Sequence, residues 1–419
     1  MPSHLFAAAA AAPASFDVET ATRAYLDTLQ GAARARSDSY FEGGYWLLLW
    51  GTLVSVGLSW LVLRTGWSAA WRGWAERVTK RRWLQPALYA LPLTLATSLL
   101  ALPWALYTDF FREKHYGLMN LSLPGWLGER AISLGVSLVM SAILIAIVFA
   151  VIRKAPRSWW LWGTGTLVAF TAFGVLIAPV FIAPLFNKYT PMAEGPMREQ
   201  ILGMAHANKV PADNVYVFDA SKQTKRISAN VSGLGPTIRI SLNDNLLNRT
   251  SPPEVKAVMG HELGHYVLGH VWKLLLGFSL VFLAGFLLLW WLTPRLLARY
   301  GARWGVRDVA DPAVTPLFTA IFSVYFLAMT PVLNTIIRTQ ESQADAFGLE
   351  AAREPDGFAA TAMKLSEYRK IEPSALEEAL FFDHPSGRTR VRMSMDWKAK
   401  HLADLPPEQR GIVRPPPMK

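Results

Sequence analysis

Six long apolar stretches limit this 419-residue chain to folds that cross a lipid bilayer. A helix needs about 20 mainly apolar residues to span the hydrocarbon core. The stretches reach that length, and they cover residues 44–64, 84–108, 131–152, 159–187, 271–293 and 314–337. We therefore predict a mainly α fold, a polytopic membrane helical bundle with about six transmembrane helices. A very large soluble core is the weaker alternative.

The apolar stretches divide the chain into five parts. They are a polar, partly helical segment, four membrane segments, a soluble part, two more membrane segments and a polar C-terminal part, at residues 1–43, 44–187, 188–270, 271–337 and 338–419. In the soluble part, "NVYVFD" (214–219) and "TIRISL" (237–242) are typical of strands, and "SGLGP" (232–236) of the turn between them. The fourth membrane segment contains Pro179 and Pro184, so we expect it to bend.

Charge and cysteine content exclude several classes of function. The formal net charge is +11, and basic residues crowd short loops such as "RVTKRRW" (77–83) and "RKAPR" (153–157) beside apolar stretches. This pattern favours an anionic bilayer surface as the partner and argues against nucleic acid. The chain has no cysteine, so a metal site has to use histidine and carboxylate ligands. Residues 1–15 lack the basic start that is typical of a signal peptide.

One predicted helix, residues 252–270, has a well-marked start and carries a metal-binding motif. Ser251 and Glu254 have the spacing of a capping box, and Pro252 occupies the first helical position. The second half of this helix contains "HELGH", an H-E-x-x-H motif at residues 261–265. An apolar stretch follows at once, which places the motif at the edge of the membrane.

The motif has the geometry of a metalloprotease site. His261 and His265 share one helix face and can present two imidazole nitrogens to one ion. Glu262 is about 100° further around the helix, where it can reach a water on the ion without binding the metal itself. His270 is about 140° from His265 on the same count, so we assign it no ligand role. A polar helix end near the headgroups is the plain alternative.

A second helix supplies the third ligand that a catalytic zinc site needs. In "NTIIRTQESQADAFG" (334–348), Asn334, Arg338, Glu341 and Asp345 fall within a stripe of about 60° on a helical wheel. We predict Glu341 as the third ligand and Asp345 as the acceptor for the outer N–H of a ligand histidine. Arg338 is expected to pair with one of these carboxylates. The alternative is a solvated helix end with an ordinary Arg–Glu pair.

A further histidine, His384, lies in a turn-like setting before Pro385 in "FFDHPSGRTR" (381–390). A hydrogen-bonding group near a metal can stabilise the oxyanion of a tetrahedral intermediate. By itself the sequence favours an ordinary loop histidine over a catalytic one.

Two other functions compete with a zinc endopeptidase. A transporter or channel would use the same His/Glu cluster to bind a permeating ion. A catalytically weak membrane quality-control scaffold would bind hydrophobic partners. The polar residues cluster at one membrane edge, and His261, Glu262, His265 and Glu341 are all intact. Both observations favour the enzyme.

Taken together, four blocks make the chain resemble the CAAX prenyl protease type 1 family, the a-factor-converting, gluzincin-type membrane zinc endopeptidases. They are "TDFFREKHYGLMN" (108–120), "IAPLFNKYTPM" (182–192), "HELGHY" (261–266), and "ESQADAFG" (341–348) followed by "DHPS" (383–386). They occur in the family's order across about residues 20–395. The resemblance implies one Zn²⁺ per chain on His261, His265 and Glu341, with Glu262 as general base.

The resemblance also implies roles outside the metal ligands. His384 and Arg390 match family residues that contact substrate or transition state, and "SANVSGLG" (228–235) matches the edge strand that pairs with extended substrate. The family's usual Asn-Ala-Tyr reads Ser228-Ala229-Asn230 here. Family members have seven membrane helices around a chamber, whereas six are counted here, and the first is the one that is absent.

Substrate and location follow as expectations. The implied partners are a peptide or protein substrate, including lipidated or membrane-inserted ones, and the lipid bilayer. The Ala/Arg-rich composition suggests a bacterial inner (cell) membrane. The resemblance places the active site in the cytoplasm, but the loops 65–83, 153–158 and 294–313 on the other side hold twelve Lys and Arg residues against three in 109–130. By the positive-inside rule, that bias indicates the opposite orientation.

Overall fold

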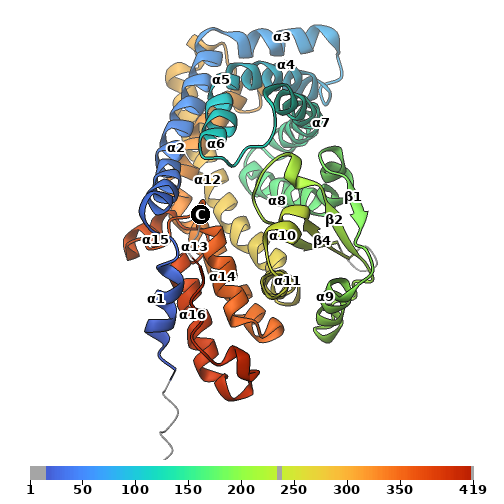
Figure 1. Ribbon diagram of the computed structural model, residues 1–419. Helices are drawn as coiled ribbons and strands as arrows, with labels where there is room; N and C mark the ends of the chain where they lie inside the picture. Colours follow the sequence, from blue (N-terminus) through green and yellow to red (C-terminus); the bar gives the residue numbers. More distant parts are fainter. Residues whose placement is uncertain (1–15, 234–237, 417–419) are drawn as a thin grey trace, which may run out of the picture.

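The computed structural model describes residues 16–233 and 238–416 and consists of helices with one small sheet (Figure 1). The α-helices are α1 (Val18–Leu26), α2 (Gly31–Arg64), α3 (Trp67–Val78), α4 (Gln85–Leu100), α5 (Leu102–Ala105), α6 (Arg112–His115), α7 (Leu123–Lys154), α8 (Trp159–Ile177), α9 (Pro196–Ala207), α10 (Asp244–Arg249), α11 (Pro252–Val267), α12 (His270–Trp304), α13 (Thr315–Ala352), α14 (Pro355–Leu365), α15 (Ala375–Phe381) and α16 (Gly387–Lys400). The strands are β1 (Tyr189–Pro191), β2 (Val215–Phe218), β3 (Ala229–Ser232) and β4 (Arg239–Asn243).

The predicted membrane bundle is confirmed. Five helical segments are long and apolar enough to cross a membrane, and the pair Gln85–Leu100 and Leu102–His115, bent by 48°, makes a sixth. The fourth predicted segment bends where its prolines lie. Its α-helix ends at Ile177 and continues as a π-helical turn over Ala178–Ile182, because a proline nitrogen cannot donate the regular helical hydrogen bond.

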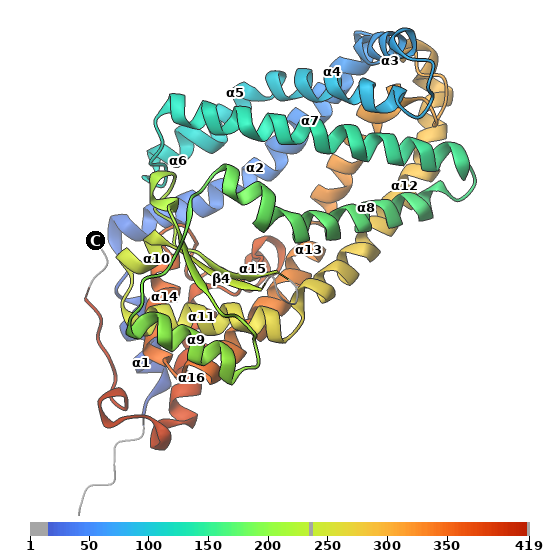
Figure 2. The ribbon, with the colours of Figure 1, turned by 90° about the vertical axis from the view of Figure 1, so that its right-hand side faces the viewer.

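The bundle is packed around an aromatic core and is tied together at the end far from the sheet. Trp159 stacks on Phe318 and meets Phe286 edge to face, so helices α8, α12 and α13 share one core. At the far end, Arg72 of α3 forms an ion pair of 2.5 Å with Asp311, which precedes α13. Figure 2 shows α3 at one end of the molecule and α1 and α16 at the other. The arginine-rich loops therefore lie opposite the sheet.

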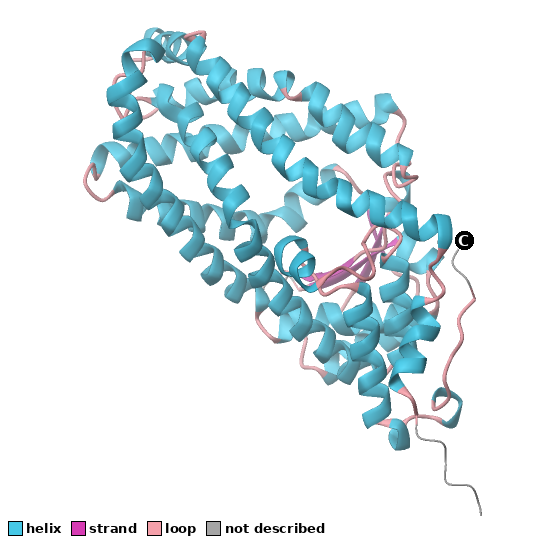
Figure 3. Cartoon of the chain, turned by 90° about the vertical axis from the view of Figure 1, so that its left-hand side faces the viewer, coloured by secondary structure: helices cyan, strands magenta, loops and turns pink. Residues whose placement is uncertain are grey.

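The sheet has four strands in the order β1-β2-β4-β3 (Figure 3). The two predicted strands are confirmed as β2 and β4, which run parallel with Val215 opposite Ile240. Strands β1 and β3 add antiparallel partners at the two edges, so β3 is an edge strand as the resemblance implied. Part of the predicted turn at 232–236 and the predicted N-terminal segment up to residue 15 lie outside the described residues. Apolar residues of α9, α10 and α11 pack together with the sheet residues in one core.

Helix α11 begins as predicted, with the capping box of Ser251 and Glu254 present. Its predicted end at residue 270 is wrong. The helix stops at Val267, because Gly269 adopts a left-handed conformation with φ +65°, and His270 begins α12. Three predicted part borders, at 43/44, 270/271 and 337/338, fall inside the continuous helices α2, α12 and α13. The division of the chain into five parts stays a prediction.

The N-terminal helix α1 packs on the C-terminal part of the chain. It contacts α14 and α16 through a cluster that includes Tyr25, Met363 and Met395. The Tyr25 hydroxyl donates a hydrogen bond of 2.9 Å to the Asp356 carboxylate. Helices from the two ends of the chain therefore pack against each other.

Candidate active site

Helices α11 and α13 cross at unusually short range because glycines occupy their contact. A Cβ atom on Gly260 would lie 2.8 Å from the Gly348 carbonyl oxygen, and one on Gly264 would lie 3.1 Å from Phe347. Atoms that close have no room for a side chain, so small residues are needed here. The close crossing brings the second half of α11 next to the polar stripe of α13.

The crossing assembles the predicted ligand set. Donor atoms of His261, His265 and Glu341 all lie within 4.8 Å of one another. The two histidines face each other with 3.1 Å between their Nε2 atoms. Glu341 turns one carboxylate oxygen towards each of them, at 3.3 Å from His261 Nε2 and 3.4 Å from His265 Nε2. Lone pairs of two nitrogens and a carboxylate therefore converge on one point.

This arrangement fits a bound metal cation. Glu341 Oε2 is buried and has no hydrogen-bond partner among the described residues, although two histidines lie close to it. A buried acceptor without a partner is costly unless a cation or water satisfies it. Two imidazoles and one carboxylate form a ligand set known for catalytic zinc, with a position left open for water or substrate.

Asp345 occupies the predicted position behind a ligand histidine. Its Oδ1 lies 2.8 Å from His261 Nδ1, so it orients the imidazole with Nε2 towards the cluster. The same oxygen accepts a 2.5 Å hydrogen bond from Arg390 Nη2. The Asp345 side chain is fully buried and Arg390 nearly so. One carboxylate thus links the ligand helix α11 to α16.

The ionisation of the α11 residues follows from their burial and their neighbours. Burial raises the pKa of Glu262 to about 7, which suits a group that must accept and return a proton near neutral pH. Burial opposes a charge on His261, but the hydrogen bond to Asp345 and the nearby carboxylate of Glu341 outweigh that effect and raise the pKa of His261 to about 10. Burial, together with the charge of His261, lowers the pKa of His265 to about 4. His265 is therefore neutral at neutral pH, as a metal ligand must be.

His384 joins the cluster from the loop before α16. Its Nε2 lies 3.1 Å from Glu341 Oε2, and its Nδ1 lies 2.8 Å from the Asp383 carboxylate. Asp383 therefore orients the ring so that Nε2 points to the ligand set. The structure brings together all seven predicted site residues, namely His261, Glu262, His265, Glu341, Asp345, His384 and Arg390.

One sequence interpretation needs correction, and the structure adds to another. Arg338 has no carboxylate partner among the described residues, and its guanidinium donates to the backbone carbonyls of Glu378 (2.8 Å) and Phe382. It therefore holds the segment that leads to His384. His270 does reach the site, with its Nδ1 2.9 Å from His265 Nδ1 and its Nε2 3.2 Å from the Gln343 side chain. His270 is not part of the ligand group, as expected, but the angular count misplaced its ring because Gly269 interrupts the helix. Gly269 was the sequence signal for that interruption.

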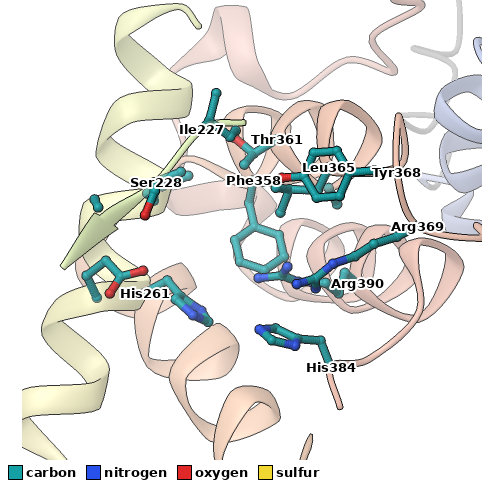
Figure 4. Close-up of a pocket in the computed structure, with 15 residues that line it drawn as sticks. Ile227, Ser228, His261, Phe358, Thr361, Leu365, Tyr368, Arg369, His384 and Arg390 are labelled. Atoms are coloured by element: carbon teal, nitrogen blue, oxygen red, sulfur yellow. The ribbon is translucent and has the colours of Figure 1, made fainter. Parts of the chain in front are cut away.

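A cavity of about 170 Å³ opens beside the ligand cluster. Strand β3 and the residues before it, Ile227 and Ser228, form one wall, and α14 with the loop after it forms the other (Figure 4). Glu262 lines the cavity and has no hydrogen bond or ion pair with any residue that the structure describes. The cavity thus contains a free carboxylate beside the ligand set and an unpaired strand edge along one side.

Two family models match this chain along most of its length. The model described as peptidase family M48 matches residues 191–397, and the one described as CAAX prenyl protease N-terminal, five membrane helices, matches residues 22–188. The first match contains every residue of the ligand cluster. The second covers the four membrane segments that precede the sheet.

Curated relatives and a solved structure agree with these matches. The chain is 30% identical over 347 residues to an uncharacterized metalloprotease, YhfN of Bacillus subtilis, and the match covers 81% of both proteins. It is also 30% identical over 180 residues to CAAX prenyl protease 1 of Saccharomyces cerevisiae, covering 43% of this chain and 40% of that protein. The crystal structure of S. mikatae Ste24p shares the fold, with a TM-score of 0.72 and 21% identity over 90% of this chain and 95% of that one.

Proposed function

This chain belongs to peptidase family M48 and is a membrane-embedded zinc metalloendopeptidase, and on that premise we propose which residues carry the reaction and what they cleave. One zinc ion is held by His261, His265 and Glu341. The observation that carries the proposal is the convergence of these three donors beside the free carboxylate of Glu262. A bound zinc ion would polarise the scissile carbonyl and make a water acidic at neutral pH.

The remaining steps belong to side chains of this chain. Glu262 takes the proton of the attacking water and passes it to the leaving amine. His384 donates a hydrogen bond from Nε2 to the negative charge that develops on the carbonyl oxygen, with Asp383 fixing its ring. Asp345 orients His261 and anchors Arg390, whose charge adds to the stabilisation of the oxyanion.

The substrate is a peptide bound in extended form. Among the described residues, strand β3 pairs only with β4, and its Ala229 lines the cavity, so an extended peptide can add as a further strand. Backbone hydrogen bonds would then supply affinity, which suits many sequences. Because the cavity lies where membrane helices end, we propose membrane-associated peptides as substrates, including CAAX-type and lipidated ones.

The decisive experiment measures cleavage of a fluorogenic, farnesylated CAAX-type peptide by purified protein. Wild type should cleave it, and Glu262→Gln should retain zinc while its rate falls by about 10²–10⁴-fold, the usual contribution of a general base. Equal activity of both proteins would rule out the mechanism. Cleavage of an unmodified peptide of the same sequence at the same rate would remove lipidation from the substrate class.

We further propose a bacterial inner-membrane location with the active site facing the cytoplasm. The arginine-rich loops, which lie at the opposite end of the bundle, then face outwards. Alkaline phosphatase fused after Lys419 tests this orientation in a bacterial host. The fusion should be inactive, and a fully active fusion would place the active site outside the cytoplasm.

A further inference from the structure

Arg369 is a charged side chain in the active-site cavity that the proposed mechanism does not use. It belongs to the loop between α14 and α15, and it reaches towards Arg390 and His384 from the wall opposite strand β3 (Figure 4). Its Nη1 atom is buried and lacks a hydrogen-bond partner. Among the residues that the structure describes, no carboxylate lies within ion-pair distance of its guanidinium.

The neighbouring charges of the cavity are already engaged. Asp383 attracts Arg369 from nearby, but its carboxylate is bonded to His384 at 2.8 Å. Arg390 already has a carboxylate partner, Asp345, at 2.5 Å. The cavity therefore contains one paired guanidinium and one unpaired guanidinium side by side. Burial lowers the pKa of Arg369, yet a guanidinium stays protonated in proteins, so the charge is retained at a cost in stability.

The loop that carries Arg369 is firmly held. Buried Ser37 of α2 donates its hydroxyl to the carbonyl oxygens of Ser366 and Arg369, at 2.5 and 3.2 Å. The backbone N–H of Arg388 donates to the Ile371 carbonyl at 2.9 Å. Contacts from α2 and α16 thus fix both ends of the segment. The direction of the Arg369 side chain is set by packing.

An ordinary surface role does not explain this side chain. Arg388, at the start of α16, shows what such a role looks like, since its side chain is 53% exposed and lies 3.7 Å from Glu372. Arg369 has neither the exposure nor the partner. A preorganised guanidinium fork without a protein acceptor is suited to binding a carboxylate through two parallel hydrogen bonds.

We propose that Arg369 is a substrate-binding residue that recognises a carboxylate of the peptide, supplied by its C-terminus or by an Asp or Glu side chain near the scissile bond. The proposal rests on the proposed function. A peptide that adds to β3 lies across the cavity from Arg369, so a single acidic group can reach it while the backbone pairs with the strand edge. The enzyme then selects for acidic groups in addition to extended conformation.

Binding to the full-length Glu262→Gln protein in detergent tests this without requiring turnover. The probes are fluorescently labelled peptides of one apolar sequence, either with a free C-terminal carboxylate, or amidated, or amidated with one Glu placed at each position in turn. A charge-assisted pair should make one acidic form bind about 10–100-fold more tightly than the amidated neutral peptide. The form that binds best identifies the source of the carboxylate.

Variants assign that preference to one side chain. When Arg369→Gln is added to the Glu262→Gln protein, the affinities for the acidic and the neutral peptide should become about equal. When Arg369→Lys is added instead, part of the preference for the acidic peptide should remain. Arg388→Gln, which removes the same charge from the surface, should keep the ratio. The thermal midpoint of the Arg369→Gln protein should be equal to or above that of its parent, because a buried unpaired charge is removed.

Three outcomes would overturn the proposal. The Glu262→Gln protein could bind acidic and neutral peptides equally, or the protein with Arg369→Gln added could keep the preference. The third outcome is a marked drop in the thermal midpoint when Arg369→Gln is added. These outcomes differ from a failure of the proposed function. Wild type that cleaves without any charge preference would overturn the role of Arg369 alone. Wild type that neither binds nor cleaves any of these peptides would overturn both.

Discussion

Gly348 lies so close to His261 that a Cβ atom on it would stand 2.7 Å from the His261 backbone nitrogen. That distance is below any van der Waals contact, so α11 and α13 can only cross at this separation with glycine at this position. The crossing is also what brings Glu341 within 3.3 Å of His261. Gly348 therefore helps to set the distance between His261, which it contacts, and Glu341, which lies two turns before it on α13.

We expect Gly348→Ala to push the two helices apart. Overpacking a close contact typically costs about 1–3 kcal/mol, and the movement would separate Glu341 from the two histidines. The variant should lose metal at chelator concentrations that leave wild type loaded, as measured by elemental analysis. Gly135→Ala on α7, where nothing lies within 4 Å, is the matched control. Because alanine has a higher helix propensity than glycine, the control should be as stable as wild type or slightly more stable. Equal metal retention by the Gly348→Ala and Gly135→Ala variants would contradict the prediction.

Asp345→Asn should damage both stability and metal binding. The change preserves shape and leaves an amide oxygen as acceptor, but it removes the negative charge and leaves Arg390 as a buried cation without a counter-charge, which typically costs about 3–5 kcal/mol. Loss of the carboxylate charge behind His261 should also weaken metal affinity about 10–100-fold. Adding Arg390→Gln should recover part of the thermal midpoint but not the metal affinity. Full recovery of both would show that Asp345 does not act through His261.

His270→Ala should weaken the metal site from outside the ligand set. His270 Nδ1 is the partner of His265 Nδ1 at 2.9 Å, and removing it frees the His265 ring to rotate. We expect metal affinity to fall about tenfold, which is the lower limit of the usual 10–100-fold loss when the partner of a metal ligand is removed. Competition with a fluorescent zinc chelator measures it. The exposed His115→Ala is the control, and identical affinities for the two variants would count against a role for His270.

Metal affinity of the metal-free protein should rise with pH. The pKa of His261 is raised to about 10, so below that pH the proton on this ring competes with the metal. Binding then releases the proton, and apparent affinity should increase about tenfold per pH unit between pH 7 and 9. Isothermal titration calorimetry of zinc binding in buffers of different ionisation enthalpy measures how many protons are released. Affinity that does not change with pH would show that His261 is already deprotonated.

Removing the metal should abolish cleavage while the bundle stays folded. The ligand cluster joins only α11 and α13, whereas the aromatic core of α8, α12 and α13 contains none of its residues. Treatment with a chelator should eliminate peptide cleavage and lower the thermal midpoint by a few degrees, because a ligand bound only to the native state adds stability. Zinc should restore both. Undiminished activity after verified metal removal would rule out a metalloenzyme.

Much of the site could be predicted from sequence because its signals are local. His261 and His265 are four residues apart on a helix whose start is marked by Ser251 and Glu254. Glu341 and Asp345 are likewise one turn apart on α13. Helical periodicity alone puts each pair on one face. The β-branched runs of β2 and β4 and the apolar membrane segments are local signals of the same kind.

Other features depended on contacts between elements distant in the chain. Arg338 was expected to bind a carboxylate and instead binds carbonyls of the segment before His384, 40 or more residues away. The contact of His270 with His265 was not predicted, because the helical count was continued across Gly269, a left-handed residue that changes the direction of the chain. The edge position of β3 came from family resemblance, since an edge depends on which strands pair.

The sequence by itself determined that this chain spans the membrane, where most of its helices lie, and which two helix faces carry the candidate metal ligands. It could do so because apolar length and the helical repeat are properties of neighbouring residues. Only the tertiary structure decided that those faces meet at Gly260 and Gly348, that Asp345 joins His261 to Arg390, and that Arg369 enters the cavity without an ion-pair partner among the described residues. The physical reason is that close packing and the pairing of buried charges depend on distances between elements, which no local pattern encodes.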